Sequence, residues 1–228
     1  MREWNAAVTA STAAVWFAHE CAHGLGYRLR GDRVSTGFNM VGSPGKRPGE
    51  PGFRSEVPVT GTPNLGTVLG PVTTWTVAGA ATLAFARWPT GKKGVVLSAT
   101  AISAGLQRLL PLVPFFAAAP FGRVVYQDEV EWGAHRVDGL RFPMSFDSFQ
   151  AALGDHSTEF LRTPAAYVGP VTSAALSAAC LAHTYRGMAR DSDSFVASAW
   201  ATAGIPITVW IAVGGVFAAL DRIIRIEW

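Results

Sequence analysis

The stretch from residue 4 to residue 26 reads WNAAVTASTAAVWFAHECAHGLG. It is long enough to cross a bilayer, because a membrane-spanning helix needs about 20 mostly apolar residues. Its last third nevertheless contains His19, Glu20 and His23. Ionisable side chains are costly inside a membrane and usually mark a functional site. We therefore interpret the stretch as a retained membrane helix with a polar site near its C-terminal end, and not as a cleaved signal peptide.

Four further stretches have the length and apolar character of membrane helices. They cover residues 65–86, 94–118, 164–185 and 195–220. Hydrophobic residues make up 49% of the 228 residues and charged residues only 15%, which is too few for the surface of a soluble helical bundle. The composition predicts an all-α polytopic membrane protein with about five transmembrane helices, folded as a single membrane domain and surrounded by lipid.

Two long loops connect the predicted helices, at residues 27–64 and 121–162. The first loop is rich in Gly and Pro and includes β-like segments at 33–40 and 53–60, so we expect a small β-containing loop after the first helix. The second loop contains the densest group of carboxylates in the chain. Metal-ligating or catalytic side chains could therefore come from the second loop.

The distribution of Lys and Arg predicts the orientation in the membrane. With five crossings, the end of the first helix, both long loops and the C-terminus share one side. That side carries twelve Lys and Arg residues, and the opposite side carries six. Because cytoplasmic loops are enriched in Lys and Arg, we expect the long loops to face the cytoplasm from a plasma or inner membrane.

The net charge is only +3, and the Lys and Arg residues are scattered along the chain, so the sequence does not indicate a nucleic-acid partner.

The segment His19-Glu20-Cys21-Ala22-His23 has the pattern HExxH. Positions i and i+4 of a helix project from nearly the same face, so the two imidazoles can bind one zinc ion. Glu20 would lie beside the zinc without being a ligand, where it can act as the catalytic base that takes a proton from a zinc-bound water. A second reading is that neighbouring polar groups simply satisfy the three side chains, but we favour the zinc site because a membrane helix rarely accommodates three such residues.

Two further motifs extend the pattern. Residues 69–74 read LGPVTT and residues 109–114 read LLPLVP. Together with HECAH and the Gly/Pro-rich loop, they make about the first 140 residues resemble the site-2 protease family. The resemblance implies an intramembrane zinc metalloprotease that cleaves a membrane-bound protein or peptide. It also implies an aspartate as third zinc ligand.

The third zinc ligand is predicted from the side of the membrane on which it must lie. The family aspartate closely follows the Leu-Pro segment, where this chain has Phe115 and Phe116, and Thr74 stands where the family usually has Asn. Asp128 is the first carboxylate after the third predicted helix and lies on the same side as HExxH, so we predict Asp128 as the ligand. Five more residues on that side could take its place: Asp138, Glu129, Glu131, His135 and His156.

Two other functions remain open at this point. A zinc-binding membrane module without proteolytic activity could bind a partner through the same fold. A membrane di-iron desaturase or hydroxylase is less favoured, because that chemistry uses many clustered histidines and this chain has five.

Arg108, the single charge in the third predicted helix, could snorkel, position a substrate or pair with a carboxylate, and we favour the pair.

Overall fold

The computed structural model describes residues 1–51, 65–125, 127–134, 157–190 and 200–228, and these residues are mostly helical. The elements are α1 (Arg2–Leu29), β1 (Ser35–Thr36), β2 (Val41–Gly42), α2 (Leu65–Arg87), α3 (Gly91–Leu109), α4 (Leu112–Ala118), the 3₁₀ helix η1 (Ala119–Phe121), α5 (Asp128–Ala134), α7 (Ala165–Arg190), the π-helical turn η2 (Trp200–Gly204), α8 (Ile205–Leu220) and β3 (Ile226–Glu227). The β-like segment expected at 53–60 lies outside the described residues.

The third predicted helix is divided in two. The expected continuous helix at 94–118 is interrupted after Leu109, and α4 begins at Leu112. Pro111 lies at the break and explains it. Proline has no N–H to donate, and its ring clashes with the carbonyl one turn earlier. The short 3₁₀ helix after α4 ends at Gly122, whose φ of 72° is a left-handed conformation that favours glycine.

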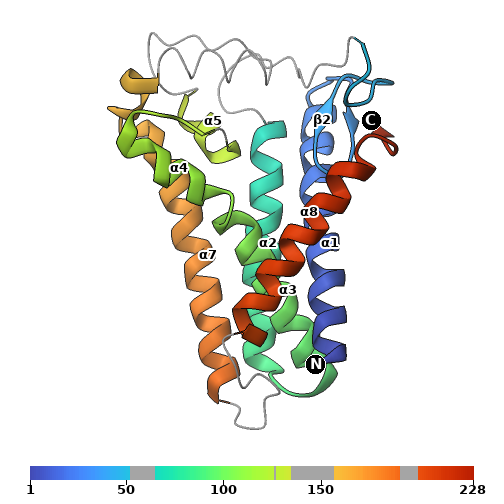
Figure 1. The fold of residues 1–228 in the computed structure, drawn as a ribbon, viewed down its shortest axis with the longest axis vertical. Helices are drawn as coiled ribbons and strands as arrows, with labels where there is room; N and C mark the ends of the chain where they lie inside the picture. Colours follow the sequence, from blue (N-terminus) through green and yellow to red (C-terminus); the bar gives the residue numbers. More distant parts are fainter. Residues whose placement is uncertain (52–64, 126, 135–156, 191–199) are drawn as a thin grey trace.

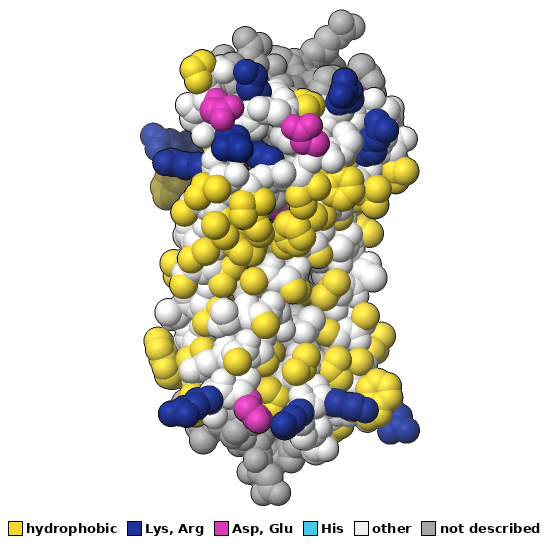
Figure 2. Space-filling view, turned by 90° about the vertical axis from the view of Figure 1, so that its right-hand side faces the viewer, with side chains coloured by type: hydrophobic (Ala, Val, Ile, Leu, Met, Phe, Trp, Pro, Cys, Tyr) yellow, Lys and Arg dark blue, Asp and Glu magenta, His cyan; other side chains and the backbone are white. Residues whose placement is uncertain are grey.

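Within the described residues, four helical segments are long and apolar enough to cross a membrane: 65–87, 91–121, 165–190 and 200–220. Helix α1 spans 28 residues but is not among them, because its apolar residues are interspersed with Asn, Thr and Ser before the His-Glu-His set. On the face shown in Figure 2, Lys and Arg side chains gather at the two ends of the molecule, and the surface between them shows hydrophobic side chains among other, mostly uncharged groups. This pattern suits a protein that crosses a membrane.

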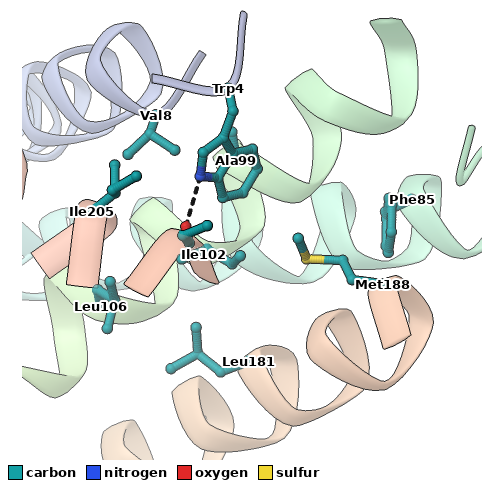
Figure 3. Close-up of a cluster of buried hydrophobic side chains, with 10 residues drawn as sticks. Trp4, Val8, Phe85, Ala99, Ile102, Leu106, Leu181, Met188 and Ile205 are labelled. Atoms are coloured by element: carbon teal, nitrogen blue, oxygen red, sulfur yellow. Dashed lines mark hydrogen bonds between the residues drawn. The ribbon is translucent and has the colours of Figure 1, made fainter. Parts of the chain in front are cut away.

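Helix α3 is the centre of the bundle and packs against α1, α2, α7 and α8 (Figure 1). Apolar side chains from α1, α2, α3, α7 and α8 meet in a buried cluster toward the N-terminal end of α1 (Figure 3). Trp4 of α1 anchors this cluster, and its indole Nε1 donates a hydrogen bond of 2.8 Å to the backbone carbonyl of Ala201 (Figure 3). This half of the bundle is a conventional packed core.

A small sheet covers the C-terminal end of α1. Its strand order is β2-β1-β3, and both pairings are antiparallel, with Ser35 opposite both Gly42 and Glu227. The sequence predicts β structure in the loop after α1 but not the third strand, which comes from the C-terminal end of the chain. Trp228 donates a 2.8 Å hydrogen bond from its Nε1 to Thr36 Oγ1 of β1, and its indole lies against Gly24 of α1.

The sheet, α5 and the C-terminal end of the chain lie at one end of the bundle, and residue 1 lies at the other end (Figure 1). Helix α5 packs against α7 and α2. The carbonyl of Glu129 in α5 lies where a Cβ at Gly169 of α7 would project. A residue larger than glycine at 169 would therefore push α5 away, and this close approach holds the carboxylates of α5 over the end of α1.

Candidate metal centre

The imidazoles of His19 and His23 point toward each other on one face of α1. Their Nε2 atoms lie 3.0 Å apart. Each Nδ1 atom faces helix α2, where His19 Nδ1 lies 2.9 Å from Thr74 Oγ1 and His23 Nδ1 lies 2.6 Å from the backbone carbonyl oxygen of Gly66. Both side chains are buried. Helix α2 therefore sets the orientation of both rings from behind.

These contacts define which ring nitrogen carries hydrogen in a neutral imidazole. A carbonyl oxygen only accepts, so His23 must donate from Nδ1 to Gly66. The Thr74 hydroxyl donates to the carbonyl of Gly70 at 3.3 Å, so it accepts from His19 Nδ1. In both neutral rings Nε2 then carries the lone pair with which a histidine binds a metal. Such hydrogen bonds behind the ligand are the usual way in which proteins orient metal-binding histidines.

Glycines on α2 make room for the rings of α1. A Cβ at Gly70 would overlap the His23 ring, and a Cβ at Gly66 would overlap the ring of Tyr27, one turn further along α1. Gly66, Gly70 and Thr74 follow one another at intervals of four residues, which places them on one face of α2. The two helices can therefore approach closely at the site, and only glycine at 66 and 70 leaves room for the rings as they are placed.

Asp128 begins α5 and brings a carboxylate to the two imidazoles. Its Oδ2 lies 3.3 Å from His19 Nε2 and 3.5 Å from His23 Nε2. Burial by itself raises the pKa of this carboxyl, but the nearby His23 imidazole and the Arg108 guanidinium hold it well below its usual range. Asp128 is therefore ionised, as a metal ligand must be.

The residues His19, His23 and Asp128 form a buried group that could hold a metal ion, with candidate ligand atoms within 4.8 Å of one another. Bonds of 2.0–2.1 Å in a tetrahedral zinc site place neighbouring ligand atoms about 3.3 Å apart. The three distances here are 3.0, 3.3 and 3.5 Å, close to that spacing. Two neutral imidazoles and one carboxylate are also ligand types that suit zinc. The residues present thus fit a small divalent metal.

Arg108 of α3 is buried beside the three candidate ligands. Its Nε and Nη2 donate to the two oxygens of Glu129 at 2.9 and 2.6 Å. Nη2 also donates to Asp128 Oδ2 at 3.2 Å. The third nitrogen, Nη1, lies 3.3 Å from His19 Nε2. The expected pairing of Arg108 with a carboxylate is confirmed, and the pair stands next to the metal group.

Glu129 and Glu131 of α5, which were also candidates for the third ligand, bond to other partners. Glu129 is fully buried, binds Arg108 and accepts a 2.7 Å hydrogen bond from Ser173 of α7. Glu131 accepts a 2.9 Å hydrogen bond from Thr67 of α2. Neither glutamate belongs to the candidate metal group. The candidates Asp138, His135 and His156 lie outside the described residues.

Glu20 is buried next to His19 on α1. Charged groups close to its carboxylate include Asp128, Arg108 and, at the end of α8, Asp221. It is not part of the candidate ligand group. This arrangement is compatible with the predicted role of a base beside the metal, which stays a prediction.

Sequence reasoning missed Thr74, Gly66 and the carbonyl of Gly70 as the groups that orient the histidines. The four-residue spacing of positions 66, 70 and 74 on a helix antiparallel to α1 is the signal that could have indicated them.

Comparison of the chain with family models, curated proteins and solved structures finds no significant match. The functional argument therefore rests on the geometry of this site.

Proposed function

We propose that this chain is an intramembrane zinc metallopeptidase, similar to site-2 proteases, that hydrolyses a peptide bond of a membrane-bound protein. The observation that carries the proposal is the near-tetrahedral spacing of His19, His23 and Asp128, next to a buried Glu20, in a bundle with four apolar helices. Three protein ligands leave a coordination position for water or substrate, as in catalytic zinc sites.

The reaction needs a Lewis acid, a base and a water. His19, His23 and Asp128 would hold the zinc, which would supply the Lewis acid that makes a water more acidic and polarises a peptide carbonyl. Glu20 takes a proton from the attacking water as the water oxygen bonds to the carbonyl carbon. Glu20 then passes that proton to the leaving nitrogen as the C–N bond breaks. One water is consumed, and the products are a carboxylic acid and an amine.

We further propose that α1 is a fifth membrane crossing. Helix α1 packs against α2, α3 and α8, three helices that belong to the candidate membrane spans. With α1 included, the metal end of the bundle carries the long connections and most of the Lys and Arg residues, which favours a cytoplasmic location for it. The substrate would reach the site laterally, between helices, at that end.

The non-proteolytic module and the di-iron enzyme make different demands on the site. A structural zinc site usually has four protein ligands, and the described residues offer three. A di-iron centre requires further clustered ligands, and the described residue His183 lies near the other end of the bundle, on α7 beside Arg186 and Phe85. Both observations favour the peptidase.

The decisive experiment is Glu20→Gln in the full chain, purified in detergent and supplied with a quenched fluorescent casein. The wild type should contain about one zinc per chain and cleave the reporter. Glu20→Gln should retain the zinc and lose cleavage at least about a hundredfold, because the amide cannot accept the proton. If the wild type binds zinc but does not cleave the reporter, or if Glu20→Gln cleaves it equally well, the non-proteolytic module is favoured. If Glu20→Gln loses its zinc, Glu20 has a structural role.

A further inference from the structure

Arg108 presents Nη1 to the candidate ligand His19, while its other two guanidinium nitrogens bind carboxylates of α5, Nε to Glu129 and Nη2 to both Glu129 and Asp128. Nε and Nη2 form a two-pronged contact with the carboxylate of Glu129 at 2.9 and 2.6 Å. Such a contact fixes the plane of the guanidinium as well as its position. Nη1 projects from the opposite side of this fork and reaches His19 Nε2 at 3.3 Å.

The partner of Nη1 is the same atom that would bind a metal. Arginine nitrogens only donate hydrogen bonds, so Nη1 donates to the His19 Nε2 lone pair. A metal bound to His19 uses that lone pair. Among the described residues, His19 is the acceptor within hydrogen-bond reach of Nη1, so this buried N–H would then require an oxygen from a water or a substrate.

The surroundings keep Arg108 in this position. Glu129 is fully buried and receives a 2.7 Å hydrogen bond from Ser173 of α7. Gly169, one turn before Ser173, lets α7 approach the backbone of Glu129. An N–H donor held in this way does not have to move when negative charge develops next to it. Such a fixed donor stabilises charge strongly in a buried site.

We infer that Arg108 is a substrate-binding catalytic residue, whose Nη1 donates to an anionic oxygen at the metal and thereby stabilises the charge that develops on the scissile carbonyl. The inference deepens the proposed peptidase function and rests on it. If Arg108 served only to balance the charges of Glu129 and Asp128, Nε and Nη2 would satisfy that role, and a contact from Nη1 to His19 would not be needed.

The test measures anion binding and does not depend on cleavage. The purified full chain is loaded with Co²⁺, whose visible spectrum reports ligands added to the metal, and is titrated with azide and separately with neutral imidazole. In Arg108→Gln, azide affinity should fall about tenfold or more, because a hydrogen bond to a charged group is lost. Imidazole affinity should change by less than about twofold, since imidazole carries no charge for the guanidinium to stabilise.

Two further variants separate the proposed role from a folding defect. Arg108→Gln leaves the buried carboxylate of Glu129 without its partner, which destabilises the protein. The double variant Arg108→Gln/Glu129→Gln removes both charges and should show the same loss of azide affinity with full metal content. Arg123→Gln, which changes an exposed arginine near the metal end of the bundle, should bind azide as the wild type does.

Each outcome decides the question. Selective loss of azide affinity in the double variant supports the inference, even if the wild type cleaves no substrate and the peptidase proposal fails. Equal loss of azide and imidazole affinity, or unchanged azide affinity, overturns it. Loss of metal from the double variant overturns it as well, because Arg108 would then act by holding Asp128. If the wild type binds no metal, both proposals fail. Metal analysis of the wild type is therefore the first measurement.

Discussion

Each half of helix α1 buries side chains in the bundle, but the two sets of buried side chains have opposite surroundings. In the N-terminal half, Trp4 and Val8 are at most 1% exposed and pack among apolar side chains of the neighbouring helices. In the C-terminal half, His19, Glu20 and His23 are at most 8% exposed and lie among polar and charged groups. One helix thus contributes both to a hydrophobic core and to a polar centre.

The difference indicates which half serves stability and which serves chemistry. Burying apolar side chains and filling space between helices stabilises a bundle, whereas burying ionisable groups costs free energy unless each is paired. In the part of the chain that the structure describes, contacts with α2, α3 and α5 offset this cost for the C-terminal half. We therefore expect substitutions in the N-terminal half to change stability and those in the C-terminal half to change metal binding.

The largest effect is expected for removal of a histidine ligand. His19→Ala or His23→Ala should weaken metal affinity by more than about a hundredfold, because a ligand is lost outright and not merely reoriented. Metal analysis of purified protein, with His183→Ala as the matched control, measures the effect. His183 is exposed on α7, so that variant should retain its metal. Full metal content in both ligand variants would refute the metal site.

Trp4→Ala should have the largest effect in the N-terminal half. It removes a buried indole and its hydrogen bond to Ala201, and we expect a loss of about 3 kcal/mol in the free energy of unfolding. Unfolding in mixed micelles measures this loss, with the exposed Trp88→Ala as control. Where the variant is folded, its metal affinity should match that of the wild type. A large drop in metal affinity would contradict the separation of the two halves.

Thr74→Val should lower metal affinity about ten- to a hundredfold without removing a ligand, because it deletes the hydroxyl that orients His19. Competition with a chelator of known affinity measures the change. Thr76→Val is the control, since Thr76 is exposed and bonds only to its own helix at Val72. If Thr74→Val and Thr76→Val behave alike, α2 does not position the ring.

The smallest effect is expected for a hydroxyl in the N-terminal half. Thr12 Oγ1 donates to Ser103 Oγ at 3.0 Å between α1 and α3. Thr12→Val should cost about 0.6 kcal/mol of stability, typical of such contacts between membrane helices, and should leave metal affinity unchanged. Thr9→Val is the control, because Thr9 is exposed. A change in metal binding on Thr12→Val would show that the polar centre extends further along α1 than we infer.

The amino-acid sequence was sufficient for the local features of the fold and the site. Long apolar runs predict membrane-length helices, because the backbone must satisfy its hydrogen bonds within each segment. The spacing of His19 and His23 predicts that both rings share a helix face, since that relation depends only on helical periodicity. The break at Pro111 was not predicted, although its physical cause is equally local.

The tertiary structure decided everything that depends on which helices approach one another. Asp128 and Glu129 are adjacent in sequence, yet only Asp128 reaches the histidines, because α5 sits between α7 and α2 with Glu129 turned toward Arg108. The roles of Thr74 and Arg108 depend in the same way on packing between segments far apart in the chain. Periodicity places side chains on one helix, but contacts between helices depend on close packing, which a single sequence does not reveal.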